Sequence, residues 1–210
     1  MNQPFAIRNS KSEIGGVNIQ MIISGVGGQG VLLVTRIFSD FALREGYPVI
    51  GSEDHGMSQR GGSVITYLKI GQFNSPLVKK GNADLLLSLE KNEAYKTLHF
   101  LKPATTDQQG GIGFINASDA RFMKEEIRNY LQERGIETHI FWADRIAREM
   151  GSIQSTNIAL IGFASAHPRF PFPYEKLRQS IGRVTPPKFR ELSLKIFDRG
   201  FSEGGRLIKL

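Results

Sequence analysis

Hydrophobic positions along the chain follow two periods, and their alternation predicts strands and helices in turn. An apolar segment at residues 21–23 leads into a glycine-rich turn, and residues 31–43 then place apolar side chains three or four positions apart until Gly46. Such spacing is typical of an amphipathic helix that ends just before a glycine. Residues 63–71 alternate instead, which is the period of a strand with two different faces. Residues 85–87 are three consecutive leucines, which predict a strand buried on both faces.

The second half of the chain repeats this alternation and predicts the fold class. Strands are expected at residues 47–52, 112–116 and 138–142, and helices at residues 91–101, 118–135, 143–150, 156–166, 174–181 and 185–198. Strands that alternate with helices predict an α/β protein with three α/β/α layers and a mostly parallel, Rossmann-like sheet. Residues 72–80 have the composition of a turn and a short return strand, so we expect an antiparallel hairpin on this sheet. We also expect one domain at residues 18–210, preceded by a flexible tail at residues 1–17.

Composition narrows the class of protein. With 40% hydrophobic residues, the 210 residues are enough for one sizeable core. The chain has no cysteine, so it offers no ligand for a cysteine-bound cluster, and any redox metal is expected on a partner. The amino terminus is polar and lacks the apolar core of a secretory signal, and 18 apolar residues nowhere run consecutively. We therefore expect a cytoplasmic protein that makes no contact with a membrane.

Charge and the remaining motifs exclude further classes. The formal net charge is +7, and residues 181–210 hold seven basic and three acidic side chains, which suits an acidic partner or a solvated helix face. The basic residues show no interleaved aromatic platform and no nucleic-acid motif occurs, so nucleic acid is not an expected partner. His99, His139 and His167 lack metal-binding spacing, so no metal site is expected. Hydrolase and ATPase motifs are also absent from the sequence.

The turn after the first apolar strand is a candidate binding site. Its proposed ligand-binding members are Gly25, Gly27, Gly28, Gln29 and Gly30. An abrupt change from strand to helix needs positive φ angles or close backbone approach, which glycine accepts. The backbone N–H groups at the start of the helix then favour an anion such as a pyrophosphate. A tight turn that binds no ligand is the alternative interpretation.

A polar and flexible segment separates the second predicted strand from the third. Glu53 or Asp54 has the spacing of the acidic residue that binds the ribose in dinucleotide folds. His55 is a candidate acid or base, because its ordinary pKa is close to neutral pH. A hydrogen bond from His55 to loop backbone or to a partner subunit is the alternative.

Further candidates follow along the chain. Arg60, next to Gly61 and Gly62, is suited to clamp a carboxylate or phosphate, and a structural ion pair is the alternative. Glu90 follows a predicted central strand at the edge where α/β proteins bind ligands, and a helix-capping carboxylate is the alternative. Asn157 begins a predicted helix and can cap it.

Three segments in this order resemble the gamma-type subunit of 2-oxoacid:ferredoxin oxidoreductases. They are Gly25-Val-Gly-Gly-Gln-Gly30, His55-Gly-Met-Ser-Gln-Arg-Gly-Gly-Ser63 and Gly81-Asn-Ala-Asp-Leu-Leu-Leu-Ser-Leu-Glu90. The second segment has the form found in beta subunits of indolepyruvate oxidoreductases. The resemblance is strong over residues 21–93 and continues at Asn157.

The resemblance implies a fold like domain III of pyruvate:ferredoxin oxidoreductase and a hetero-oligomeric enzyme. It implies oxidative decarboxylation of an aryl 2-oxoacid, with coenzyme A as co-substrate in contact with the two glycine-rich segments, Glu90 and Asn157. His55 and Arg60 are the expected catalytic residues. This chain is expected to hold no cofactor alone, because the larger alpha subunit carries thiamine diphosphate and [4Fe-4S] clusters that pass electrons to ferredoxin. A nicotinamide-dependent dehydrogenase and a non-catalytic nucleotide-binding protein are the alternatives.

Overall fold

A sheet of seven strands forms the centre of the part of the chain that the structure, a computed structural model, describes: residues 5–7, 17–56 and 61–208. The strands are β1 (Phe5–Ile7), β2 (Ile19–Val26), β3 (Val49–His55), β4 (Ser63–Ile70), β5 (Leu85–Ser88), β6 (Ile112–Asn116) and β7 (Glu137–Phe141). Their order across the sheet is β1-β3-β4-β2-β5-β6-β7. β2, β5, β6 and β7 are parallel neighbours, whereas β4 is antiparallel to both β2 and β3.

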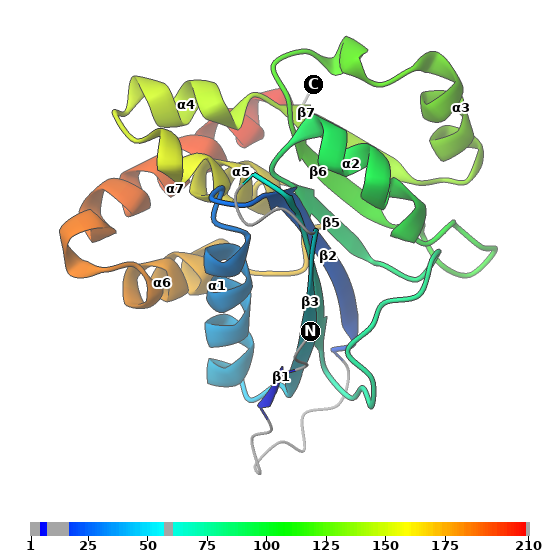
Figure 1. Ribbon diagram of the computed structural model, residues 1–210, viewed down its shortest axis with the longest axis horizontal. Coiled ribbons are helices and arrows are strands. Elements are labelled where there is room, and N and C mark those ends of the chain that lie inside the picture. The colour runs from blue at the N-terminus through cyan, green and yellow to red at the C-terminus, as the bar shows by residue number, and fades with distance from the viewer. Residues whose placement is uncertain (1–4, 8–16, 57–60, 209–210) are drawn as a thin grey trace.

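Helices cover the sheet on both faces and complete three layers, as predicted (Figure 1). The helices in the described residues are α1 (Val31–Arg44), α2 (Lys91–Thr97), α3 (Glu125–Glu133), α4 (Ala143–Glu149), α5 (Thr156–Ser165), α6 (Tyr174–Val184) and α7 (Pro187–Leu207), with short 3-10 turns η1 (Leu98–Phe100), η2 (Ala120–Phe122) and η3 (Ile153–Ser155). One core joins α1, α4, α5, α6 and α7 to one face of the sheet. A smaller core joins α2, η1 and α3 to the other face.

The leucine-rich strand β5 lies between parallel neighbours, β2 and β6. Leu85 and Leu87 belong to the larger core and Leu86 to the smaller one, and all three are buried. The prediction of a strand covered on both faces is therefore confirmed.

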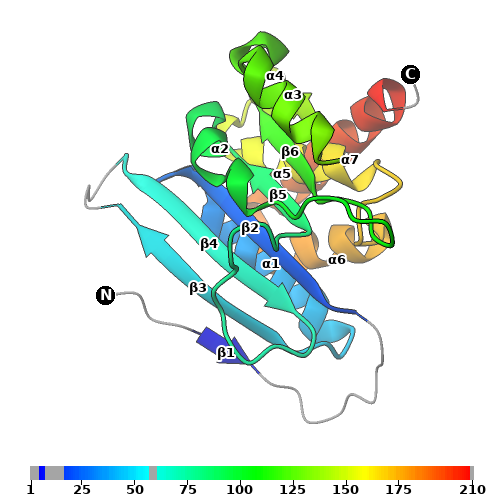
Figure 2. The same ribbon diagram turned by 90° about the vertical axis from the view of Figure 1, so that its right-hand side faces the viewer.

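The antiparallel hairpin is built from other segments than the sequence predicted. β3 pairs antiparallel with β4, and residues 56–62 connect them in the sequence. These two neighbouring strands are therefore the hairpin (Figure 2). Residues 72–80 form no strand, because β2 and β3 already occupy both edges of β4. β3 also continues through Glu53, Asp54 and His55, which were predicted to lie in a loop.

The pair α5 and α7 explains a second difference from the predicted elements. Nine consecutive residues of α5 are buried, because the sheet lies on one side of this helix and α7 on the other. A Cβ atom on Gly162 would lie 2.2 Å from the Phe197 carbonyl oxygen, and one on Gly200 would lie 2.3 Å from the Ala159 carbonyl oxygen. The two glycines thus allow close helix packing, and α7 continues through Gly200 to Leu207 rather than ending near residue 198.

The predicted tail contains one described element. Residues Phe5–Ile7 form β1, which pairs antiparallel with β3 at the edge of the sheet. The division into a tail and a domain stays a prediction. None of the helices in the described ranges combines the length and apolar character that crossing a bilayer requires.

Candidate functional site

The carboxyl ends of the parallel strands form the edge of the sheet at which chain connections change faces. β2 leads to α1 on one face, whereas β5 leads to α2 on the other (Figure 1). β6 leads to η2 and α3 on the face of α2, and β7 leads to α4 on the face of α1. Connections that diverge in this way open a crevice, which is the usual place of ligands in open α/β sheets.

The glycine-rich turn between β2 and α1 lies at this edge. Gly28 and Gly30 have φ angles of 100° and 80°, in the left-handed region that glycine adopts without strain. The Gln29 side-chain oxygen accepts a hydrogen bond from the Val26 N–H at 2.8 Å, so Gln29 closes the turn on itself. Within the described residues no side chain caps α1, and no acidic residue lies in its first turn. The uncapped helix start therefore favours an anion.

A second glycine turn touches the first. The Gly27 N–H donates to the Gly62 carbonyl oxygen at 2.9 Å, and a Cβ on Gly27 would lie 3.6 Å from the Gly61 nitrogen. This contact follows from the register of the sheet, in which Ser63 of β4 lies opposite Val26 of β2. The structure thus brings together two glycine-rich segments that lie more than 30 residues apart in the sequence.

The structure describes one of the two residues expected to be catalytic. His55 ends β3 with its side chain 53% exposed, and its Nε2 lies 3.2 Å from Glu53 Oε2. β4 separates β3 from β2, and His55 does not line the crevice. Arg60 lies outside the described residues. The catalytic roles of both residues stay predictions.

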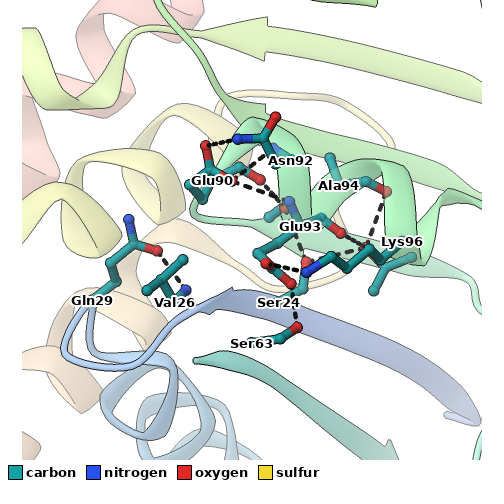
Figure 3. A network of polar contacts seen from close by, with 11 residues as sticks. Ser24, Val26, Gln29, Ser63, Glu90, Asn92, Glu93, Ala94 and Lys96 are labelled. Carbon is teal, nitrogen blue, oxygen red and sulfur yellow. Dashed lines mark hydrogen bonds and ion pairs between the residues drawn. The ribbon is translucent and has the colours of Figure 1, made fainter. Parts of the chain in front are cut away.

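Glu90 caps the start of α2. Its carboxylate accepts hydrogen bonds from the backbone N–H groups of Asn92 at 2.7 Å and Glu93 at 3.1 Å (Figure 3). The helix-capping alternative is thus present in the structure, and the same side chain also lines the crevice. Contact of Glu90 with a ligand stays a prediction.

A buried polar network next to the glycine turns was missed in the sequence. Glu93 is 4% exposed and accepts hydrogen bonds from the Ser63 hydroxyl and, at 2.7 Å, from Lys96 Nζ (Figure 3). The Ser24 hydroxyl of β2 donates to the Ser88 hydroxyl of β5 at 2.9 Å. These contacts join α2 to β4 and β2 to β5 beside both turns. The sequence feature that could have indicated this network is Glu93, a carboxylate three positions after the capping residue Glu90.

Asn157 supports the glycine turn from α5. Its side chain is 1% exposed, its Nδ2 donates to the Gly30 carbonyl oxygen at 3.2 Å, and its Oδ1 accepts the Ile158 N–H at 2.7 Å. A Cβ atom on Gly30 would lie 2.2 Å from the Asn157 Nδ2. Asn157 therefore contacts the backbone of the turn, and its contact with a ligand stays a prediction.

The crevice itself measures about 250 Å³ and is lined by residues that follow β2, β5, β6 and β7. Asn116 ties its walls together, since its Nδ2 donates to the Leu89 carbonyl oxygen at 3.0 Å and to Asp144 Oδ1 at 3.1 Å, and its Oδ1 accepts the Ala143 N–H at 3.0 Å. Further lining residues were also missed in the sequence, among them Lys91, Trp142 and Arg148. No local motif marks them, because the topology alone brings them together.

Comparison with known proteins identifies the family. The profile of the pyruvate ferredoxin/flavodoxin oxidoreductase family matches residues 20–203. The chain belongs to this family. It is 34% identical to the indolepyruvate oxidoreductase subunit IorB of Thermococcus kodakarensis over 203 residues, which cover 90% of this chain and 98% of the relative. The IorB subunit of Pyrococcus horikoshii has the same identity and coverage.

Solved structures of this oxidoreductase family share the fold. A keto/oxoacid ferredoxin oxidoreductase gamma subunit from Geobacter sulfurreducens superimposes with a TM-score of 0.67 at 21% identity, over 90% of this chain and 99% of that one. The 2-oxoglutarate:ferredoxin oxidoreductase of Magnetococcus marinus, solved with 2-oxoglutarate, coenzyme A and succinyl-CoA bound, gives 0.69 at 16% identity, over 90% of this chain and 31% of that chain. The expected gamma-subunit fold is thus confirmed.

This oxidoreductase-family chain also holds a histidine cluster at the amino end of β7. Glu137 Oε1 lies 2.7 Å from His139 Nε2 and 3.0 Å from His167 Nε2, and the Arg169 guanidinium pairs with Glu137 Oε2. Burial lowers the pKa of His167. The His167 Nδ1 accepts the Arg169 backbone N–H, so the neutral ring carries its proton on Nε2. A metal ion would need the lone pair of that nitrogen, so the cluster does not fit a metal site.

Proposed function

We propose that this chain is the cluster-free small subunit of a thiamine-diphosphate-dependent 2-oxoacid:ferredoxin oxidoreductase that uses indolepyruvate or a related aryl 2-oxoacid. Support comes from the IorB relatives, which match this chain over nearly their whole length. The reaction is the oxidative decarboxylation of the 2-oxoacid to an acyl-coenzyme A, with ferredoxin as electron acceptor. The chain alone is inactive.

The contact between the two glycine turns carries the proposal for coenzyme A. The bond from the Gly27 N–H to the Gly62 carbonyl oxygen holds both turns at the uncapped start of α1. The backbone N–H groups there bind the pyrophosphate of coenzyme A, and Asn157 fixes the turn by holding the Gly30 carbonyl. Arg60, beyond the described residues, is proposed to clamp a second anionic group.

The larger subunit is proposed to hold the thiamine diphosphate and the iron–sulfur clusters. The present chain has no cysteine, so it does not fit the ligand set of a [4Fe-4S] cluster. The same carboxyl edge suits contact with that subunit, because Leu32 in the first turn of α1 and Ile153 in η3 are exposed apolar side chains. Thiamine diphosphate would supply the decarboxylation chemistry, while this chain orients the acyl acceptor.

Co-expression with the large subunit of an indolepyruvate oxidoreductase tests this function. We expect a stable complex that reduces viologen with indolepyruvate only when coenzyme A is present, and no reduction by the small chain alone. Pyruvate serves as the comparison substrate, with slower turnover expected. A complex that forms but needs no coenzyme A would contradict the proposed role of the glycine turns. Arg60→Ala is expected to raise the KM for coenzyme A.

A nicotinamide-dependent dehydrogenase is less compatible with the sheet. In a dinucleotide fold the acidic ribose ligand ends the strand beside the glycine turn. Glu53 lies instead on β3, which β4 separates from β2, and it pairs with His55. Titration of the isolated chain with NADH is therefore expected to show no saturable binding, and hydride transfer without a partner would overturn the proposal.

A further inference from the structure

The single tryptophan of the chain lies at the crevice. Trp142 directly follows β7, is 41% exposed and lines the crevice at the carboxyl edge. A large aromatic side chain is usually mostly buried, and its exposed face offers a stacking surface to a flat ligand. Stacking of a nucleobase on such a ring is independent of the identity of the base.

Two cationic side chains accompany this ring. Lys91 and Arg148 line the crevice, and neither forms an ion pair with a carboxylate in the part of the chain that the structure describes. The acidic lining residues are engaged elsewhere, since Glu90 caps α2 and Asp144 Oδ1 accepts hydrogen bonds from Asn116 and Thr156. The crevice therefore offers an aromatic face together with two cations for a phosphate.

Size and position relate the crevice to the glycine turn. A volume of about 250 Å³ is smaller than the roughly 300–1,000 Å³ of complete small-molecule sites. The crevice thus accommodates one part of a longer ligand. Gln29 belongs to both places, because its side chain closes the glycine turn and also lines the crevice. A ligand with its pyrophosphate at the turn can extend directly into the crevice.

We infer that the crevice binds the 3′-phosphoadenosine end of coenzyme A, with the adenine on Trp142 and the 3′-phosphate between Lys91 and Arg148. This subsite extends the proposed coenzyme A function and rests on it. The subsite also defines the orientation of coenzyme A. Its adenosine lies next to the end of β7 and the start of α4, and its thiol end points from the glycine turn toward the partner subunit.

Tryptophan fluorescence of the full chain tests the subsite without a partner, because Trp142 is the only emitter of its kind. We expect adenosine 3′,5′-bisphosphate to quench it saturably, 5′-AMP to bind about tenfold more weakly, and pantetheine to leave it unchanged, with N-acetyltryptophanamide correcting for absorption by the base. Lys91→Ala and Arg148→Ala should each reduce the preference for the bisphosphate. Arg145→Ala is the control, because Arg145 pairs with Glu149 on the same helix and does not line the crevice. Equal affinity for both nucleotides in the wild type would overturn the phosphate assignment.

The assembled complex separates this inference from the proposed function. Trp142→Ala should raise the KM for coenzyme A about tenfold with kcat unchanged, and Trp142→Phe, which keeps an aromatic face, by about threefold. An unchanged KM in Trp142→Ala, with turnover still dependent on coenzyme A, would refute the subsite and leave the proposed function standing. Wild-type turnover without coenzyme A would instead refute the proposed function.

Discussion

Substitution of Gly30 by alanine probes the support of the glycine turn. Two costs add at this position. The φ angle of 80° is in the left-handed region, which costs an L-residue about 1–2 kcal/mol. The new Cβ would also lie 2.2 Å from the Asn157 Nδ2, and such overpacking costs about 1–3 kcal/mol. We expect Gly30→Ala to lower the free energy of unfolding by about 2–5 kcal/mol, measured by urea denaturation followed by far-UV circular dichroism.

Gly28 provides the matched control for this experiment. It also has a positive φ angle, 100°, but a Cβ there would meet no atom of the described residues within 4 Å. Gly28→Ala should therefore cost only the backbone term of about 1–2 kcal/mol. In the double variant Gly30→Ala/Asn157→Ala the contact is gone, so the loss should be smaller than the sum of the two single losses. Equal losses for Gly28→Ala and Gly30→Ala, or strict additivity, would refute the assignment of Asn157 as the support of the turn.

Three further predictions concern packing and the histidine cluster. Gly200→Ala should lower the free energy of unfolding by about 1–3 kcal/mol because its Cβ would meet a carbonyl oxygen of α5. Gly205→Ala in the same helix should instead raise the free energy of unfolding by up to about 1 kcal/mol, because its Cβ would meet no atom of the described residues within 4 Å. Burial lowers the pKa of His167, so the unfolded state binds the proton more readily and stability should fall as the pH drops below about 6.5. Urea titrations at pH 7.5 and 5.5 measure this loss in the free energy of unfolding, and His167→Gln should abolish it. The same loss between the two pH values in that variant would contradict the prediction. Zinc should leave the melting temperature unchanged, because the cluster of Glu137, His139 and His167 does not fit a metal, and a rise of several degrees would refute that conclusion.

Elements with strong apolar patterns were predicted well from the sequence, and the differences have physical causes. The leucines of β5 and the helix stop at Gly46 follow local rules that the fold does not override. The end of β3 was predicted three residues too early, because the strand lies near the edge of the sheet and its last residues, which include His55, are polar and partly exposed. α7 was predicted too short because Gly200 has low helix propensity, whereas close packing against α5 requires a glycine there.

The glycine turn could be located from the sequence, but most of the residues that line the crevice could not. Its motif is local, so residues 25–30 were identified without the fold. Glu90 and Asn157 were identified as candidates, and the structure adds that one caps α2 and the other supports Gly30. Trp142 and Arg148 follow β7, more than 100 residues after the turn, and only the strand order brings them to the same crevice.

The register of β4 has a consequence for natural and engineered length variants of this chain. Ser63 is paired with Val26. The number of residues in β4, rather than the length of the connection before it, therefore decides whether the Gly62 carbonyl oxygen lies next to the Gly27 N–H. Deleting one residue within β4 would withdraw Gly62 by about 3.3 Å and turn the neighbouring side chains to the opposite face. Insertions are therefore best tolerated ahead of Gly61, where they leave this spacing intact.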